Sequence, residues 1–153
     1  MNTPVLTNNR VPAMADDAIA KARALEAITS QMPQVPIPTD HVLHGGLYAR
    51  TIVIPAGVLL TGAFIKVPTL LVFDGHAHVN TTGEGLELCG RHVLAASAGR
   101  RQVFMAHEDT SLTMVFATSA TTVDQAEEEF TNEAHLLASR NADAVNTITI
   151  TGE

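Results

Sequence analysis

The sequence lacks tryptophan, and its 153 residues include one tyrosine, one cysteine and only 4% aromatic residues. A single cysteine excludes an intramolecular disulfide bond and a zinc site built from several thiolates. Because Cys89 lies between Leu88 and Gly90 in a strand-like run, we expect it to be a small buried residue. The shortage of aromatic side chains disfavours a platform on which sugars stack. With 46% apolar residues, the core must be filled mainly by Val, Ile, Leu, Ala and Met.

Basic residues are scarce as well. Nine Lys and Arg against 16 Asp and Glu give a formal net charge of −7, which argues against binding to nucleic acid or to an anionic membrane. The polar N-terminus has no apolar segment of the kind that signal peptides carry. The apolar stretch from Thr51 to Phe73 is interrupted by prolines, glycines and Lys66, so it predicts broken strands and not a membrane-spanning helix.

Three segments are predicted along the chain. Residues 1–40 form an N-terminal arm, a helix and a proline-rich linker, residues 41–120 form a β-barrel, and residues 121–153 form a C-terminal helix and tail. The first helix is expected over residues 14–31, because apolar side chains recur there at helical spacing. That stripe consists of Ile19, Ala22, Leu25, Ile28 and Met32.

Short apolar runs separated by turn residues predict the strands of the central segment. The expected ranges are 47–54, 57–65, 69–74, 76–81, 85–89, 91–96, 101–107 and 111–118. Many short strands at this spacing indicate a mainly β fold, with an eight-strand jelly-roll β-barrel as its named form, flanked by an N-terminal and a C-terminal helix.

The C-terminal segment predicts a second helix over residues 122–139, in which Thr122 and Gln125 form a capping-box signature. The three glutamates at 127–129 are expected to form a solvated face of that helix. Thr and Ile then alternate from Thr147 to Thr151, which predicts a strand outside the barrel. Such a tail is able to add a strand to a neighbour's sheet.

Seven histidines invite a search for a metal site. His76 and His78 are two apart on a predicted strand, so they share a face and form the strongest candidate pair. We expect them to point to solvent instead, because Ala77 and Val79 are the natural inward residues. His41 and His44, before the first barrel strand, are weaker candidates. His92 and His107 are expected in polar surroundings, the latter in a solvated turn beside Glu108.

No pattern forces a catalytic site. The sequence has no Gly-rich phosphate loop, no Gly-x-Ser-x-Gly turn and no third ligand at a spacing that would complete a metal triad. We therefore predict no catalytic residue, no bound cofactor and no metal. Arg50, Arg100 and Arg101 are expected to be solvated or paired with the acidic surface, with interface anchors as the alternative.

Glycines occur at motif spacing, at Gly57, Gly75, Gly90 and Gly99. They match glycines of the two sequence motifs of the cupin family, which the barrel therefore resembles. The metal-ligand positions of those motifs hold other residues: Ala63 and Ile65 for the His-x-His pair, Thr69 or Leu70 for the glutamate, and Arg101 or Gln102 for the second-motif histidine. The resemblance thus implies a cupin-like jelly roll without the family's metal chemistry.

A second resemblance rests on short segments that recur in order. They are residues 44–50, 54–57 and 60–63, then His92-Val93-Leu94, residues 97–101 and residues 106–110. Together they are similar to small cupin-like proteins of tailed bacteriophages over about residues 41–133.

This resemblance implies a non-enzymatic structural protein. The expected role is a virion accessory, such as a capsid decoration or head- or tail-associated subunit, located in the virion or the host cytoplasm. Its expected partners are further copies of the chain and other virion proteins, contacted through the terminal arms. The alternatives are a divergent metal-binding cupin enzyme that rebuilt a site from its histidines, and a small-molecule-binding cupin module.

Overall fold

A computed structural model describes residues 9–80 and 85–153. The helices are α1 (Asp16–Thr29), α2 (Val123–Phe130) and two short 3-10 helices, η1 (Ala134–Leu136) and η2 (Ala138–Arg140). The strands are β1 (Arg10–Val11), β2 (Thr39–His44), β3 (Leu47–Ile54), β4 (Leu59–Thr61), β5 (Thr69–Val79), β6 (Leu86–Ala96), β7 (Val103–Ala106), β8 (Thr110–Ala117) and β9 (Asn146–Ile150).

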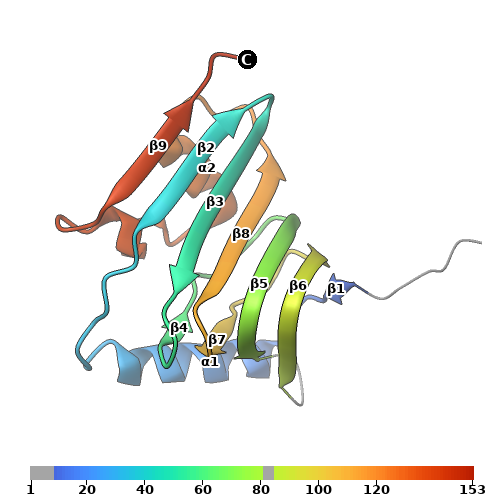
Figure 1. Cartoon of the computed structure of the whole chain (residues 1–153), viewed down its shortest axis with the longest axis vertical. Coiled ribbons are helices and arrows are strands. Elements are labelled where there is room, and N and C mark those ends of the chain that lie inside the picture. The colour runs from blue at the N-terminus through green and yellow to red at the C-terminus, as the bar shows by residue number, and fades with distance from the viewer. Residues whose placement is uncertain (1–8, 81–84) are drawn as a thin grey trace, which may run out of the picture.

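The strands form one mixed sheet that folds over on itself (Figure 1). The order of its strands is β1-β6-β5-β8-β3-β2-β9. Strand β7 pairs with β5 on one side and with β4 on the other, so β4 is connected to the sheet by β7. Strand β8 lies between β3 and β5 and is antiparallel to both. A late strand inserted between two earlier ones, opposite a short β4–β7 pair, is a jelly-roll arrangement. The predicted mainly β fold with an N-terminal and a C-terminal helix is confirmed.

Strand β5 belongs to both halves of the barrel. Residues 70–74 pair with β8, and residues 77–79 pair with β7. Between these two sets lies Gly75, where an added Cβ would come within 2.5 Å of the Thr110 hydroxyl oxygen. Only glycine permits that approach of two strands. The expected break at Gly75 is therefore a bend inside one strand, and β6 likewise runs on through Gly90.

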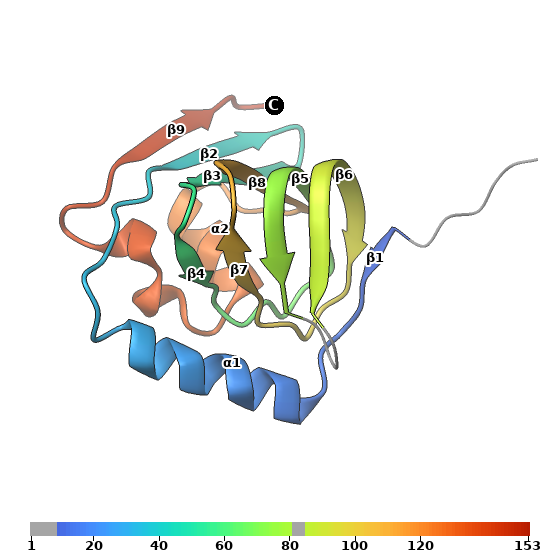
Figure 2. The same cartoon turned by 60° about the horizontal axis from the view of Figure 1, so that its bottom comes forward.

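The predicted first helix is present as α1, which crosses the open end of the barrel (Figure 2). Ala22 is its buried residue, and Ile19 and Leu25 are half-buried. The far end of the predicted apolar stripe does not pack, because Ile28 is 64% exposed and Met32 is 58% exposed. The stripe therefore has the correct period but only its first half covers the barrel.

The second helix is shorter than predicted. It starts as expected, with the Thr122 hydroxyl accepting a hydrogen bond from the Gln125 backbone N–H. It ends at Phe130 because Thr131 is extended (φ −148°) and the Phe130 carbonyl accepts from the Lys66 backbone N–H at 2.8 Å. The remaining predicted helical residues form η1 and η2.

Strands also come from the segments on both sides of the predicted barrel. Residues 10–11, expected in the arm, pair parallel with β6, and β2 begins at Thr39 within the expected linker. The predicted C-terminal strand is present as β9, but it pairs parallel with β2 of the same chain, so its placement outside the barrel was wrong. The rest of the arm, residues 1–8, and most of the turn predicted at 82–85 lie outside the described residues.

Large apolar side chains fill the interior of the barrel. The fully buried members of the core are Tyr48, Ile54, Phe73, Ala77, Ala106 and Ala126, and Phe104, Phe116 and Phe130 are almost as buried. Across residues 9–80 and 85–153, no helix is long and apolar enough to cross a membrane.

Candidate functional site

The two positions that match the cupin His-x-His pair lie in an irregular segment between β4 and β5. Ile65 packs against the hydrophobic core, and its backbone N–H donates to the Arg100 carbonyl at 2.8 Å. Its neighbour Ala63 offers no donor atom. Neither position can bind a metal ion through its side chain.

Arg101, at a position matching the second-motif histidine, is held by two carboxylates. Its guanidinium donates to Glu26 of α1 at 2.6 Å and contacts Glu133, which follows α2. The Arg101 side chain is only 2% exposed. Of the two predicted states, pairing with acidic residues is therefore confirmed and solvation is wrong, because Arg101 is buried and ties both helical segments to the barrel.

Arg100 is buried in a different way. It donates to the Thr69 hydroxyl at 2.7 Å, to the Ser97 carbonyl at 2.7 Å and to the Gln102 side-chain oxygen at 3.3 Å. Within the described part of the chain, no carboxylate pairs with it. Burial consequently lowers the pKa of Arg100 to about 10, and the group is still a cation at neutral pH.

A buried polar network joins α2 and η2 to the inner face of the sheet. Glu127, predicted to be solvated, is 1% exposed. Its carboxylate accepts from Arg50 at 2.7 Å, from Ser139 at 2.6 Å and from Arg140 at 2.9 Å. Burial raises the pKa of Glu127, but these hydrogen bonds outweigh it and the net shift is downward. The glutamate is therefore an internal anion with matched partners, and Arg50 is another predicted surface residue that lies inside.

The same network continues to β9 through His41. Its ring nitrogens contact the Tyr48 hydroxyl and the Asn146 side-chain oxygen, each at 2.7 Å. The Asn146 amide donates onward to the Ser139 carbonyl at 2.8 Å, which fixes its orientation. Burial lowers the pKa of His41, so the neutral ring is favoured. With both nitrogens engaged, His41 has no lone pair for a metal.

His44 does not join His41. It lies three residues along β2, where side chains alternate between faces, and it is exposed. Its ring nitrogen Nδ1 contacts the Thr151 hydroxyl at 2.8 Å. The predicted weak pairing of His41 and His44 is thus not formed, because the two side chains point to opposite sides of the sheet.

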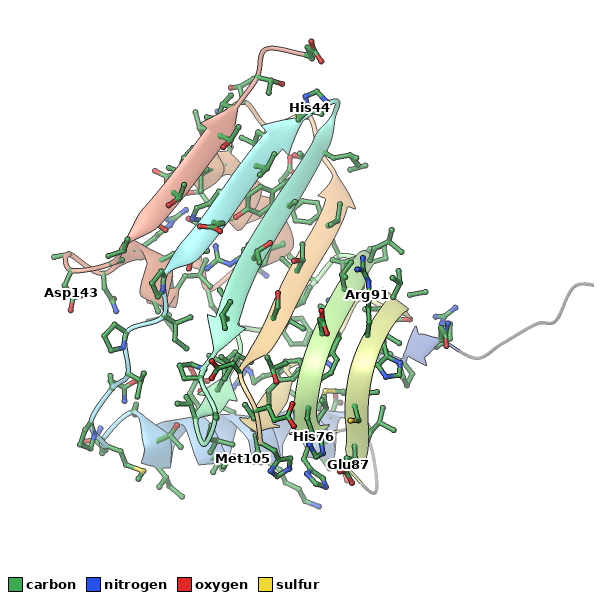
Figure 3. All side chains as sticks on the ribbon, viewed as in Figure 1. His44, His76, Glu87, Arg91, Met105 and Asp143 are labelled. Atoms are coloured by element: carbon green, nitrogen blue, oxygen red, sulfur yellow. The ribbon has the colours of Figure 1, made fainter. Side chains whose placement is uncertain are left out.

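His76 and His78 point outward from β5, as expected, while Ala77 and Val79 are buried (Figure 3). The His76 Nε2 atom lies 2.5 Å from a carboxylate oxygen of Glu87, and the His78 Nε2 atom lies 3.6 Å from the other oxygen. His78 also contacts His107, which was expected in a solvated turn. The sequence could not reveal this grouping, because three separate segments supply it.

The remaining candidates stay apart. Cys89 is exposed on β6, so the prediction of a buried residue is wrong. The His92 Nε2 atom lies 2.9 Å from the Cys89 carbonyl oxygen. Among the residues described, no three His, Cys, Asp or Glu side chains are placed to hold a metal ion as they stand.

The outer face of the sheet, from β9 to the paired halves of β5 and β6, carries exposed apolar side chains. Its most exposed apolar side chains are Val42, Leu47, Val53, Leu70 and Val93, which are 37% to 51% exposed. The register puts smaller residues between them, including Ala49, Thr51, Thr113, Val115 and Ala95. Figure 1 looks onto this face, and the described helices lie behind it or below it.

Charged residues are few on the outer face. The register assigns it Asp40, Asp74 and Arg91, and the last two are opposite each other. A signal for this face was present in the sequence, because Leu70-Leu71-Val72-Phe73 is apolar at every position, whereas a strand with one solvated face alternates. A shallow hollow of about 290 Å³ indents the face beside β1.

No protein-family model matches the chain, and no curated protein matches its sequence. Among solved structures, the chain is similar to the conserved SPY1581 protein of unknown function from Streptococcus pyogenes, with 15% identity over 78% of this chain and 99% of that one, and a TM-score of 0.44. It is also similar to salicylate 1,2-dioxygenase from Pseudaminobacter salicylatoxidans, with 16% identity, 75% of this chain covered and a TM-score of 0.47. The chain spans 35% of that dioxygenase. Similarities at this level say nothing about activity.

Proposed function

We propose that this protein is a non-enzymatic assembly subunit that packs against another copy of itself through the outer face of its sheet. The observation that carries the proposal is the exposed apolar surface formed by residues such as Leu70 and Val93, which are 51% and 49% exposed. Contiguous apolar surface of this kind is typical of sites where proteins associate.

The size of the outer face suits a modest symmetric interface. Six strands spaced by about 4.8 Å, each with about six residues on a rise of about 3.3 Å, cover roughly 600 Å² in projection. Stable interfaces bury about 800 Å² of accessible surface on each partner, and side-chain relief makes accessible area larger than projected area. A second copy fits the low charge of this face, because two such faces bring few like charges together.

The specific form of the proposal is a bacteriophage virion accessory subunit. It is supported by the resemblance of the sequence to small cupin-like phage proteins and by the loss of the cupin ligand residues at Ala63 and Ile65. Jelly rolls are common in capsid proteins. In this form, the outer face joins copies within the particle, and the edge strand β9 presents a free strand edge to other virion proteins.

The test places charge on the outer face. In the Leu70→Glu/Val93→Glu double variant, two carboxylates replace exposed apolar side chains that touch little else, so the barrel should still fold. We expect the wild-type protein to sediment as an oligomer and the double variant as a monomer. Ile28→Glu, at an apolar residue that is 64% exposed on α1, is the matched control and should leave the oligomer intact.

Two results would overturn the proposal. One is a wild-type protein that remains monomeric at the highest concentration that can be reached. The other is an oligomer that persists unchanged in the double variant, which would move the interface away from this face.

A further inference from the structure

We infer that His76, His78, His107 and Glu87 form a surface site for a divalent transition-metal ion of the Zn²⁺, Co²⁺ or Ni²⁺ class. These four residues, called the histidine cluster below, lie on β5, β6 and the turn between β7 and β8. They do not occupy the positions that match the cupin ligand motifs. The inference is independent of the proposed assembly role.

The side chains of the histidine cluster already contact one another. Ring centroids of His76 and His107 are 4.8 Å apart, and those of His78 and His107 are 4.7 Å apart. The Glu87 carboxylate bridges His76 at 2.5 Å and His78 at 3.6 Å. Three imidazoles and one carboxylate therefore lie next to one another, although they do not surround a single ion as they stand.

The backbone holds these donors in place. His76 and His78 are two residues apart on one strand, and Glu87 is directly opposite His78 in the β5–β6 ladder. The backbone N–H of His107 donates to the His76 carbonyl at 2.8 Å, which anchors the third imidazole beside the first. Three ligands on fixed backbone lose less entropy on binding an ion than ligands on a mobile loop.

Ligand chemistry selects the class of ion. Neutral imidazole suits Zn²⁺, Co²⁺ and Ni²⁺. Three imidazoles and one carboxylate are three neutral donors and one anionic donor, which is enough for four-coordinate binding. Glu87 adds one carboxylate, which lies beside the imidazole of His76 and supplies an oxygen donor. Large oxygen-seeking ions such as Ca²⁺ would find one carboxylate only.

His78 Nδ1 and His107 Nε2 are in direct contact, closer than the roughly 3.3 Å that separates two nitrogens bound to one tetrahedral ion. One of these rings must turn before both can bind. The His78 side chain is 53% exposed and His107 is also exposed, so that turn disturbs no core packing.

The experiment is a titration of the untagged protein with Co²⁺, followed by its visible absorption bands, and then displacement by Zn²⁺. We expect one ion per chain, and affinity reduced at least about tenfold in both His78→Ala and His107→Ala. His44→Ala is the matched control, because His44 is equally exposed, at 53%, on another strand.

The same titration can also contradict the inference. Absence of stoichiometric binding by the wild-type protein would overturn the inference, as would unchanged affinity in both cluster variants or an equal loss in His44→Ala. Thermal unfolding without metal checks that the variants fold. The Leu70→Glu/Val93→Glu variant should keep its metal affinity, so a failed assembly test and a failed metal test can be told apart.

Discussion

Glu127 is the residue on which the inner network depends. Its side chain is 2% exposed and receives hydrogen bonds from two arginines and a serine. Burying a carboxylate is costly unless its partners replace water, and here they do. Removing the anion would take away the carboxylate that pairs with Arg50, while Arg140 would keep its longer ion pairs with Asp124 and Glu128.

We therefore expect Glu127→Gln to lower the free energy of unfolding by about 3 kcal/mol, as measured by urea denaturation. Glu128→Gln, on the exposed side of the same helix, should change it by less than about 0.5 kcal/mol. The two variants differ by one position and share the same charge change. An equal effect of both would mean that net charge, and not the buried network, is responsible.

The lowered pKa of Glu127 also predicts that the folded protein loses stability in acid. Because the folded-state pKa of Glu127 lies below its ordinary value of 4.5, the folded protein binds this proton less tightly than the unfolded chain. Its contribution to stability is complete above that value and is lost as the pH falls through the folded-state pKa. Unfolding experiments below pH 4.5 should show a shallower pH dependence in Glu127→Gln than in the wild-type protein.

His41 makes the folding stability depend on pH in a higher pH range than Glu127 does. Burial holds its folded-state pKa below the ordinary 6.5, so the unfolded chain binds more protons as the pH falls through that value. Stability should therefore decline on acidification from about pH 6.5. We expect His41→Gln to remove part of this decline in urea titrations, whereas His92→Gln, with a side chain at the surface, should preserve it.

At the scale of elements, β9 has a larger role than a tail. It pairs with β2, and its Asn146 supplies the partner of the buried His41 ring. A chain that ends at Val145 loses that partner and exposes the edge of β2. We expect this truncation to lower the melting temperature, with faster hydrogen exchange in β2 than in β5. A truncation that unfolds like the full chain would show that β9 adds nothing to the stability of the sheet.

Some elements could be predicted because local pattern decides them. The β3 range and the start of α2 follow from alternation and from the Thr122 cap, both of which act within a few residues. The bends inside β5 and β6 could not be predicted, because a glycine marks a turn and a bend equally well. Only the contact of Gly75 with Thr110 decides between them.

Residues with charge were the hardest to place from sequence. Arg101 and Glu127 are buried beside partners that are distant in sequence, and the distance between Arg101 and Glu26 along the chain is 75 residues. The histidine cluster has the same property. Spacing identifies His76 and His78 as a pair, but only the fold adds His107 and Glu87.

At the scale of the whole molecule, self-association should appear as a property of stability. If a second copy covers the outer face, a higher protein concentration stabilises the folded state relative to the unfolded state. The melting temperature then rises with protein concentration. We expect this rise in thermal scans across a wide range of wild-type concentrations. The Leu70→Glu/Val93→Glu variant should have the same melting temperature at every concentration. The melting temperature of Ile28→Glu should rise with concentration as it does for the wild-type protein.

The pairing of β2 with β9 has a consequence for biosynthesis. β2 is made well before its partner on that edge, because 105 residues separate His41 from Asn146 along the chain. Until β9 leaves the ribosome, the β2 edge is open and Asn146 is missing from the side of His41. This edge of the sheet therefore closes late, whatever the order in which the other strands pair.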